Sequence, residues 1–184
     1  MPRHIAFLRA LNVGGRTVTM DRLASIVRST GATDVSTFLA SGNVVFTTTK
    51  RSETAVRTAL ATALAEALGY EVATFLRTPA ELRAILARPE LARGRAGAVA
   101  TNIALLEEPL AAAAAKRVLA LANDTDRFAL VGRELFWFCA CKQSDSDFCN
   151  TVFEKTAGVS STFRSVNTLE RLAAKLVDDE SDGR

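Results

Sequence analysis

One stretch near the N-terminus, Leu-Arg-Ala-Leu-Asn-Val-Gly-Gly-Arg at residues 8–16, combines residue types that suit ligand binding. An apolar run typical of a strand ends there in Asn12, Gly14 and Gly15, with an arginine on each side. Glycines let a backbone approach a ligand closely, and backbone amides beside arginine suit an anion. The spacing matches neither a dinucleotide fingerprint nor a phosphate-binding P-loop. The structural alternative is a turn that requires positive φ, in which Asn12 bonds its own backbone.

A second candidate, Ser41-Gly42-Asn43, lies between two short apolar runs and predicts a hairpin turn. Turn propensity alone explains these residue types, so their role is either structural or ligand-binding. In the β-α-β-β-α-β unit predicted below, the end of the first strand lies beside the start of the third. We therefore expect residues 12–15 to lie near Gly42 and Asn43, with Arg9 between the two loops.

A third candidate lies before the last helix, at Thr162, Arg164, Asn167 and Thr168. Helix N-termini favour anions, although Asn167 also suits a simple cap. If Arg164 meets the first site, two arginines would form an anion pocket. The predicted ligand-binding residues are Arg9, Asn12, Gly14, Gly15, Arg16, Ser41, Gly42, Asn43, Arg164, Asn167 and Thr168.

Catalysis and metal binding have little support in the sequence. His4 is the only histidine, Ser41 has no visible base to activate it, and acids at residues 145 and 147 suit a helix start. Cys139 and Cys141 share a strand face and could join Cys149 around a metal, but structural zinc usually takes four ligands. We expect reduced, partly buried thiols, no catalytic residues, no metal and no cofactor.

The length and composition of the chain predict a folded protein with a substantial core. Its 184 residues are 48% hydrophobic, and no apolar run reaches the roughly 18 residues that span a bilayer. The N-terminus lacks the pattern of a signal peptide, and the odd number of cysteines argues against a disulfide framework. We expect a cytoplasmic protein that makes no membrane contact, and the sequence does not reveal its oligomeric state.

Charge is unevenly distributed along the chain. Residues 1–77 carry nine basic and five acidic side chains, whereas residues 78–184 carry fourteen and fifteen. Arginine greatly outnumbers lysine, which can reflect codon bias as well as a basic surface. The charge therefore gives only weak support to a nucleic-acid partner.

Hydrophobic periodicity predicts a β-α-β-β-α-β unit over residues 1–77. Strands are expected at residues 4–9, 35–39, 44–46 and 71–76, and helices at residues 20–30 and 53–68. The strands are apolar on both faces, so something, the second half of the chain in our interpretation, should cover the face that the helices leave free.

Residues 78–97 are interpreted as a short helix followed by an Arg-, Gly- and Pro-rich linker. Residues 98–184 repeat the order β-α-β-β-α and add a final helix capped by Asn167. The predicted fold is therefore α+β, with two ferredoxin-like (βαββαβ-type) halves packed together and antiparallel sheets covered by helices.

The motifs also resemble a known family. Leu8-Arg9, Asn12 to Gly15, and Ser41 to Phe46 match the bacterial domain of unknown function numbered 1697, and Thr162, Arg164, Asn167 and Thr168 match its second signature. The resemblance covers nearly the whole chain and implies no activity, because the family is uncharacterised. The chain departs from the family pattern at Ala10, where glycine is usual, at Thr17, where asparagine is common, and at Ser165-Val166, which replace Asn-Trp.

The leading hypothesis is a non-catalytic binding protein for an anionic ligand at the Asn-Val-Gly-Gly loop. That ligand would be a phosphometabolite, a nucleotide or a nucleic acid. One alternative is an enzyme of unknown reaction that uses the same pocket, with acids from the second half. Another is a structural or interaction module whose motifs only shape turns.

Overall fold

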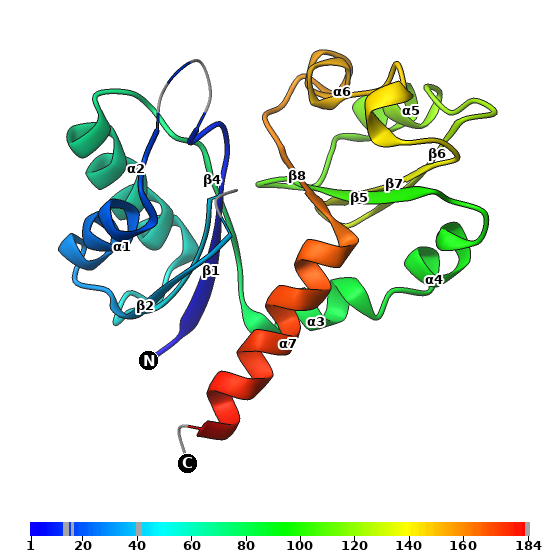
Figure 1. Cartoon of the computed structure of the whole chain (residues 1–184). Helices are drawn as coiled ribbons and strands as arrows, with labels where there is room; N and C mark the ends of the chain where they lie inside the picture. The colour runs from blue at the N-terminus through cyan, green and yellow to red at the C-terminus, as the bar shows by residue number, and fades with distance from the viewer. Residues whose placement is uncertain (13–14, 16, 40–41, 183–184) are drawn as a thin grey trace. The chain divides into compact units, whose positions relative to one another are not determined.

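The computed structural model describes residues 1–12, 15, 17–39 and 42–182 (Figure 1). The chain divides into two compact units, here called the first unit (Met1–Ala80) and the second unit (Glu81–Arg184). Each is a four-stranded antiparallel sheet with helices, which confirms the α+β class. The packing of the two halves against each other stays a prediction. In the described part of the chain, no helix has the length and apolar character needed to cross a membrane.

The first unit has the predicted β-α-β-β-α-β order. Its elements are β1 (Arg3–Leu8), α1 (Met20–Ser29), β2 (Thr33–Phe38), β3 (Asn43–Thr47), α2 (Glu53–Leu68) and β4 (Thr74–Arg77). The strands lie in the order β2-β3-β1-β4, so β1 and β3 form the central antiparallel pair. This pairing brings the end of β1 beside the start of β3.

Local signals explain where the helices of the first unit begin and end. Thr19 caps α1 by accepting a hydrogen bond from the Arg22 N–H, and Gly69 ends α2 in the left-handed conformation. Apolar residues from both helices then pack on one face of the sheet. That core includes Ala6, Leu8, Val44, Phe46, Leu23, Val27, Val56, Leu60 and Leu64.

The second unit repeats this order between additional helices. After α3 (Pro79–Leu86), its elements are α4 (Pro89–Arg95), β5 (Ala100–Leu105), α5 (Ala112–Leu119), β6 (Asp126–Val131), β7 (Glu134–Cys139), the short 3₁₀ turn η1 (Gln143–Asp145), α6 (Asn150–Ala157), β8 (Thr162–Ser165) and α7 (Val166–Asp182). The strand order is β6-β7-β5-β8. Figure 1 shows α5 and α6 on one side of this sheet and α4 and α7 on the other.

Two elements of the second unit differ from the sequence prediction. The segment predicted as a linker contains α4, which begins at Pro89 and buries Leu91. Proline suits the first turn of a helix because its missing N–H has no partner there. The strand β8 was not predicted, since it is only four residues long and alternates polar with apolar side chains around Arg164.

Aromatic residues fill the core of the second unit on both faces of β7. On one face Trp137 packs with Phe148, and its indole N–H donates to Asp126 Oδ1 at 2.6 Å. On the other face α4 comes so close that a Cβ on Gly94 would lie 2.1 Å from Cζ of Phe138. Glycine at residue 94 is therefore required by this close approach.

Candidate functional site

Hydrogen bonds hold both ends of the loop that follows β1. The Asn12 side-chain oxygen accepts a hydrogen bond from the Val18 N–H at 2.7 Å, across six residues. The Tyr70 hydroxyl donates to the Leu11 carbonyl at 3.0 Å. These contacts agree with the structural interpretation, in which the asparagine closes a turn.

The β2–β3 hairpin lies against this loop, as the strand order requires. The Leu8 N–H donates to the Gly42 carbonyl at 2.8 Å, and a Cβ on Gly42 would lie 3.2 Å from the Leu8 Cβ. Gly42 also has a positive φ of 77°. Asn43 is fully buried, and its amide donates to the Phe38 carbonyl at 2.8 Å. The side-chain amide of Asn43 thus stabilises the β2–β3 hairpin to which it belongs.

The other predicted residues of this region are less informative. Val13, Gly14, Arg16 and Ser41 lie outside the described residues. Gly15 is exposed with a φ of 80°, which glycine adopts at little cost. Arg9 is partly exposed, and its N–H donates to the Ala73 carbonyl at 2.9 Å.

Arg164 lies in β8 and is only 8% exposed. Its guanidinium donates to the Thr162 hydroxyl at 2.7 Å and to the Phe163 carbonyl at 2.9 Å. Burial lowers its pKa to about 10, because a charged group is less stable away from water. Arg164 and Arg9 belong to different units, so the predicted pairing of these two arginines stays a prediction.

Ser165, and not Asn167, caps the last helix. The Thr168 N–H donates to the Ser165 hydroxyl oxygen at 3.2 Å, and the two hydroxyl groups lie 2.9 Å apart. Serine is among the residues preferred at helix N-caps, because its hydroxyl oxygen accepts from a free N–H of the first turn. Val166, which replaces the usual tryptophan, is 1% exposed, as a core position would be.

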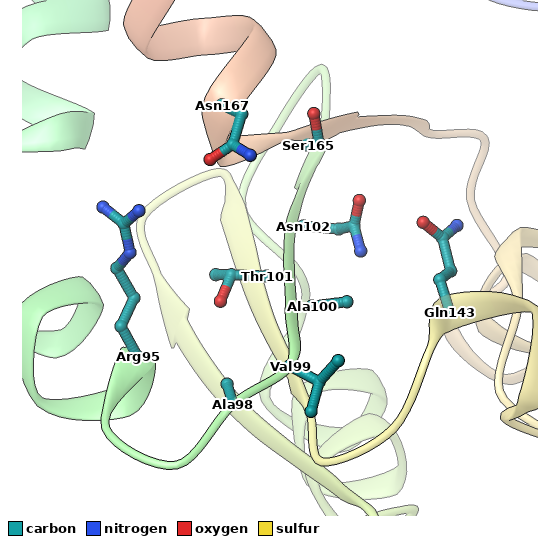
Figure 2. Close-up of a pocket in the computed structure, with 9 residues that line it drawn as sticks. All are labelled: Arg95, Ala98, Val99, Ala100, Thr101, Asn102, Gln143, Ser165 and Asn167. Carbon is teal, nitrogen blue, oxygen red and sulfur yellow. The ribbon is translucent and has the colours of Figure 1, made fainter.

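A polar pocket of about 250 Å³ lies beside this helix start, within the second unit (Figure 2). It borders the first residues of β5, the start of α7, the end of α4 and the turn η1. Its lining residues are Arg95, Ala98, Val99, Ala100, Thr101, Asn102, Gln143, Ser165 and Asn167. Of the predicted site residues, this pocket includes Asn167, while Thr168 takes part in the adjoining cap.

Asn102 is the most unusual residue of this pocket. It is only 4% exposed, yet among the described residues its side-chain amide has no hydrogen-bond partner. The residue lies on β5 opposite Trp137 and Ser165, and Figure 2 shows its amide pointing into the space beside Gln143. Because this amide opens onto the pocket, ordered water or a ligand there can supply its hydrogen-bond partner.

The strand edge in the pocket adds a backbone donor. The Leu106 N–H donates to the Arg133 carbonyl on the β7 side at 2.9 Å. Because successive N–H groups of a strand point to opposite sides, the odd-numbered residues of β5 direct theirs toward β8. β8 ends at Ser165, opposite Asn102. The Thr101 N–H therefore lies beyond the last strand pair and faces the pocket.

Arg95 supplies the positive charge of the pocket. Its guanidinium contacts Glu170 Oε1 at 2.5 Å, and both side chains are 43% exposed. The first N–H groups of a helix have no intrahelical partner, and Ser165 satisfies only that of Thr168. This end of the helix is the positive end of its dipole. The pocket thus presents a cation, backbone donors and side-chain amides together.

Sequence reasoning missed Arg95, Thr101, Asn102 and Gln143. One signal was present: Asn102 interrupts the small apolar residues Ala100 and Ala104 on a strand face that packs in the core. An amide at a core position needs a hydrogen-bond partner. The other three residues come from segments distant in sequence, and only the fold brings them together.

The cysteines form no bridge. The Sγ atoms of Cys139 and Cys141 lie 3.4 Å apart as free thiols, and Cys149 is exposed. Burial raises the pKa of Cys139 to about 11; a backbone hydrogen bond with Cys141 lowers it, while the Cys141 thiol and the charge of Asp126 raise it further. Over the described range there is no group of three or more His, Cys, Asp or Glu that could hold a metal ion.

Comparisons with known proteins define the family and the fold. The structure of the conserved bacterial protein SP0830 from Streptococcus pneumoniae resembles this one with a TM-score of 0.73 and 21% sequence identity, over 96% of this chain and 98% of that chain. No curated protein matches the sequence. The family model for a protein of unknown function, DUF1697, matches residues 1–136. The chain therefore belongs to the DUF1697 family.

Proposed function

We propose that the protein is a non-catalytic binding protein for a small anionic ligand, and that the ligand occupies the pocket at the start of α7. The observation that carries this proposal is the Asn102 amide, which is 4% exposed, has no described partner and lines the pocket. The amide opens onto the pocket, so a bound ligand would take the place of water as its hydrogen-bond partner.

The charges around the pocket support an anion. The Arg95 guanidinium and the first N–H groups of α7 both attract negative charge. Glu170 partly offsets Arg95 through their ion pair. The Arg95–Glu170 pair has no net charge, so a second negative charge on a ligand gains little attraction from it but adds to the cost of desolvation, which favours a singly charged ligand.

The composition of the pocket supports binding over catalysis. None of its lining residues is His, Cys, Asp, Glu or Lys, the side chains that most often act as general acids or bases. The Ser165 hydroxyl caps the helix, and no base is hydrogen-bonded to it among the contacts described. A serine nucleophile needs such a base.

The predicted loop after β1 remains a second possible location for the ligand. The side chains of Asn12 and Asn43 bond to backbone groups of the first unit. Those two amides therefore do not need a ligand, and the second unit offers the better-equipped site. We also propose a cytoplasmic location, supported by three cysteines that are free thiols.

Titration of the ¹⁵N-labelled full chain with sodium acetate and with sodium phosphate tests the proposed site. We expect chemical-shift changes at the amides of Thr101, Asn102, Val166 and Asn167. Arg95→Gln should weaken acetate binding about fivefold, because a charge-assisted hydrogen bond is lost. High salt should weaken binding in the same direction.

Arg93→Gln is the matched control for Arg95→Gln. Arg93 lies on the same helix and forms its own ion pair with Glu90, yet it does not line the pocket. Its substitution removes the same charge and should leave acetate binding unchanged. Equal weakening by both substitutions would show a diffuse charge effect, and shifts confined to the loop after β1 would place the site in the first unit.

A further inference from the structure

The pocket has two chemically different ends. Figure 2 shows Arg95 and Asn167 on one side of β5, and Asn102 and Gln143 on the other. The first end carries a full positive charge and the start of a helix. The second end carries two neutral carboxamides. A ligand that satisfies both ends must itself be bipartite.

The charged end suits a carboxylate. Arg95 already holds the Glu170 carboxylate, so its guanidinium is positioned for a planar anion. The Arg95–Glu170 pair has no net charge, so the second charge of a phosphate gains little attraction there but costs more to desolvate than the single charge of a carboxylate. A ligand carboxylate can instead share the guanidinium with Glu170 and accept hydrogen bonds from the helix N–H groups.

The neutral end suits an amide. The carboxamide of Asn102 offers one acceptor and two donors, and burial restricts its position. The group that matches an adjacent donor and acceptor is another amide. Gln143 offers the same pair of functions from the turn η1, so the ligand amide would lie between two carboxamides.

The space between the ends suits a short, slender molecule. The Thr101 N–H faces this space from the strand edge, and the side chains of Ala98 and Ala100 leave room for a close approach. The pocket volume of about 250 Å³ lies below the roughly 300–1,000 Å³ typical of pockets for drug-sized ligands. The ligand is therefore small, or only its terminal part enters.

We infer that the ligand is a carboxylate with a neighbouring amide group, as in an N-acylated amino acid or the C-terminal residue of a peptide. The carboxylate lies at Arg95 and the start of α7, and the amide lies against Asn102. This inference rests on the proposed function and specifies the chemical class that the same site accepts.

Three probes of the full chain, followed by ¹⁵N chemical shifts, test the inference. Acetate supplies the anion alone, N-acetylglycine supplies the anion and the amide, and N-acetylglycinamide supplies the amide without the charge. We expect N-acetylglycine to bind about tenfold more tightly than acetate, since one or two hydrogen bonds are added. N-acetylglycinamide should bind more weakly than N-acetylglycine by a similar factor.

Asn102→Leu tests the contribution of the neutral end of the pocket to binding separately from that of the charged end. Leucine keeps the side-chain size but cannot hydrogen-bond, so the advantage of N-acetylglycine over acetate should disappear while acetate still binds. Arg95→Gln should weaken both carboxylates by a similar factor. Circular dichroism and the fluorescence of Trp137 verify that each variant is folded.

A longer peptide distinguishes the two sources of this chemistry. An N-acetylated tetrapeptide ending in glycine should bind at least as well as N-acetylglycine if the site reads peptide C-termini. Weaker binding of the tetrapeptide identifies a free N-acyl amino acid as the ligand class. Either result agrees with the inferred carboxylate and amide.

Two outcomes would count against these ideas in different ways. If acetate and N-acetylglycine bind equally well at this pocket, the inference about the amide is wrong and the proposed anion site survives. If none of the carboxylates, nor phosphate, shifts the amides of residues 100–102 and 165–168, the proposed function itself is wrong.

Discussion

In the first unit the buried amide of Asn43 bonds to its own hairpin, whereas in the second unit the buried amide of Asn102 has no described partner. Both asparagines lie on a central strand pair of the same fold. Their different surroundings show that a residue type at a strand end does not identify a site. What distinguishes a binding residue is a hydrogen-bonding capacity that the fold leaves unused.

The helices provide a second contrast between the units. In the first unit α1 and α2 pack on one face of the sheet. The second unit carries α5 and α6 on one side of its sheet and adds α4 and α7 on the other. These two added helices supply Arg95 and Asn167, so the pocket belongs to the part of the second unit that has no counterpart in the shared strand order.

The largest expected effect concerns α4. Gly94→Ala would place a methyl group 2.1 Å from the ring of the buried Phe138. We expect a loss of about 2–3 kcal/mol in the free energy of unfolding, because the buried ring and the helix must move apart to admit the methyl group. Urea unfolding followed by Trp137 fluorescence measures it, since the protein's single tryptophan lies in the second unit.

A double variant sharpens this result. Phe138→Leu makes room for the new methyl group, so Gly94→Ala should cost at least about 1 kcal/mol less in that background. An unchanged cost would mean that α4 does not pack against β7 as described.

The two asparagines form the next test. Asn43→Ala removes a buried hydrogen bond and leaves the Phe38 carbonyl without that donor, so we expect a loss of about 2 kcal/mol. Asn102→Ala breaks no described hydrogen bond and should change stability by under about 0.5 kcal/mol. Urea unfolding of both variants measures the difference, and a large loss for Asn102→Ala would reveal a structural role for its amide.

Ala10 offers a smaller effect, in the direction of greater stability. Its φ of 56° is unfavourable for a residue with a Cβ. Ala10→Gly should raise the free energy of unfolding by about 0.5 kcal/mol, the strain relieved minus the added freedom of the unfolded chain. Thermal unfolding is the measurement.

Ala96→Gly in the second unit serves as the control for Ala10→Gly. The φ of Ala96 is −61°, an ordinary value for alanine. Here only the entropy of the unfolded chain changes, so the substitution should destabilise by about 0.5 kcal/mol. If both substitutions destabilise, the positive φ at Ala10 carries no cost.

The last test is a pH dependence of stability that arises in the second unit. Burial raises the pKa of Cys139 from 9.0 to about 11, so the folded state keeps this thiol protonated where the unfolded chain would ionise. The associated stability is present below pH 9 and is lost as the pH rises toward 11. Urea midpoints across this range should fall less steeply for Cys139→Ala, and identical slopes would contradict the raised pKa.

The sequence predicted the fold well because the strongest signals were local. The periodicity of residues 20–30 and 53–68, the cap at Thr19 and the stop at Gly69 each act within a few residues. β8 and α4 escaped prediction for a related reason. Their residues have mixed polarity and gain stability from tertiary contacts, such as that of Gly94 with Phe138, which no local pattern reveals.

The site was harder to predict than the fold. Asn12, Gly42 and Asn43 attracted attention because they suit turns, and the structure places them in turns or at a turn's edge. Whether a side-chain amide has a hydrogen-bond partner depends on groups from segments that are distant in the sequence. Asn167 was found because it lies near a helix start, which is a local signal, whereas Arg95 reaches the pocket from a helix about seventy residues earlier.

Ser165 is both the last residue of β8 and the cap of α7, so the strand passes into the helix with no intervening loop. Because no flexible loop separates the two elements, the first N–H groups of α7 are held in place before a ligand binds. Little conformational entropy should be lost on association, because those groups are already ordered. We therefore expect the site to be preorganised. Its association rate should be limited by diffusional encounter with the ligand and not by a conformational change of the protein.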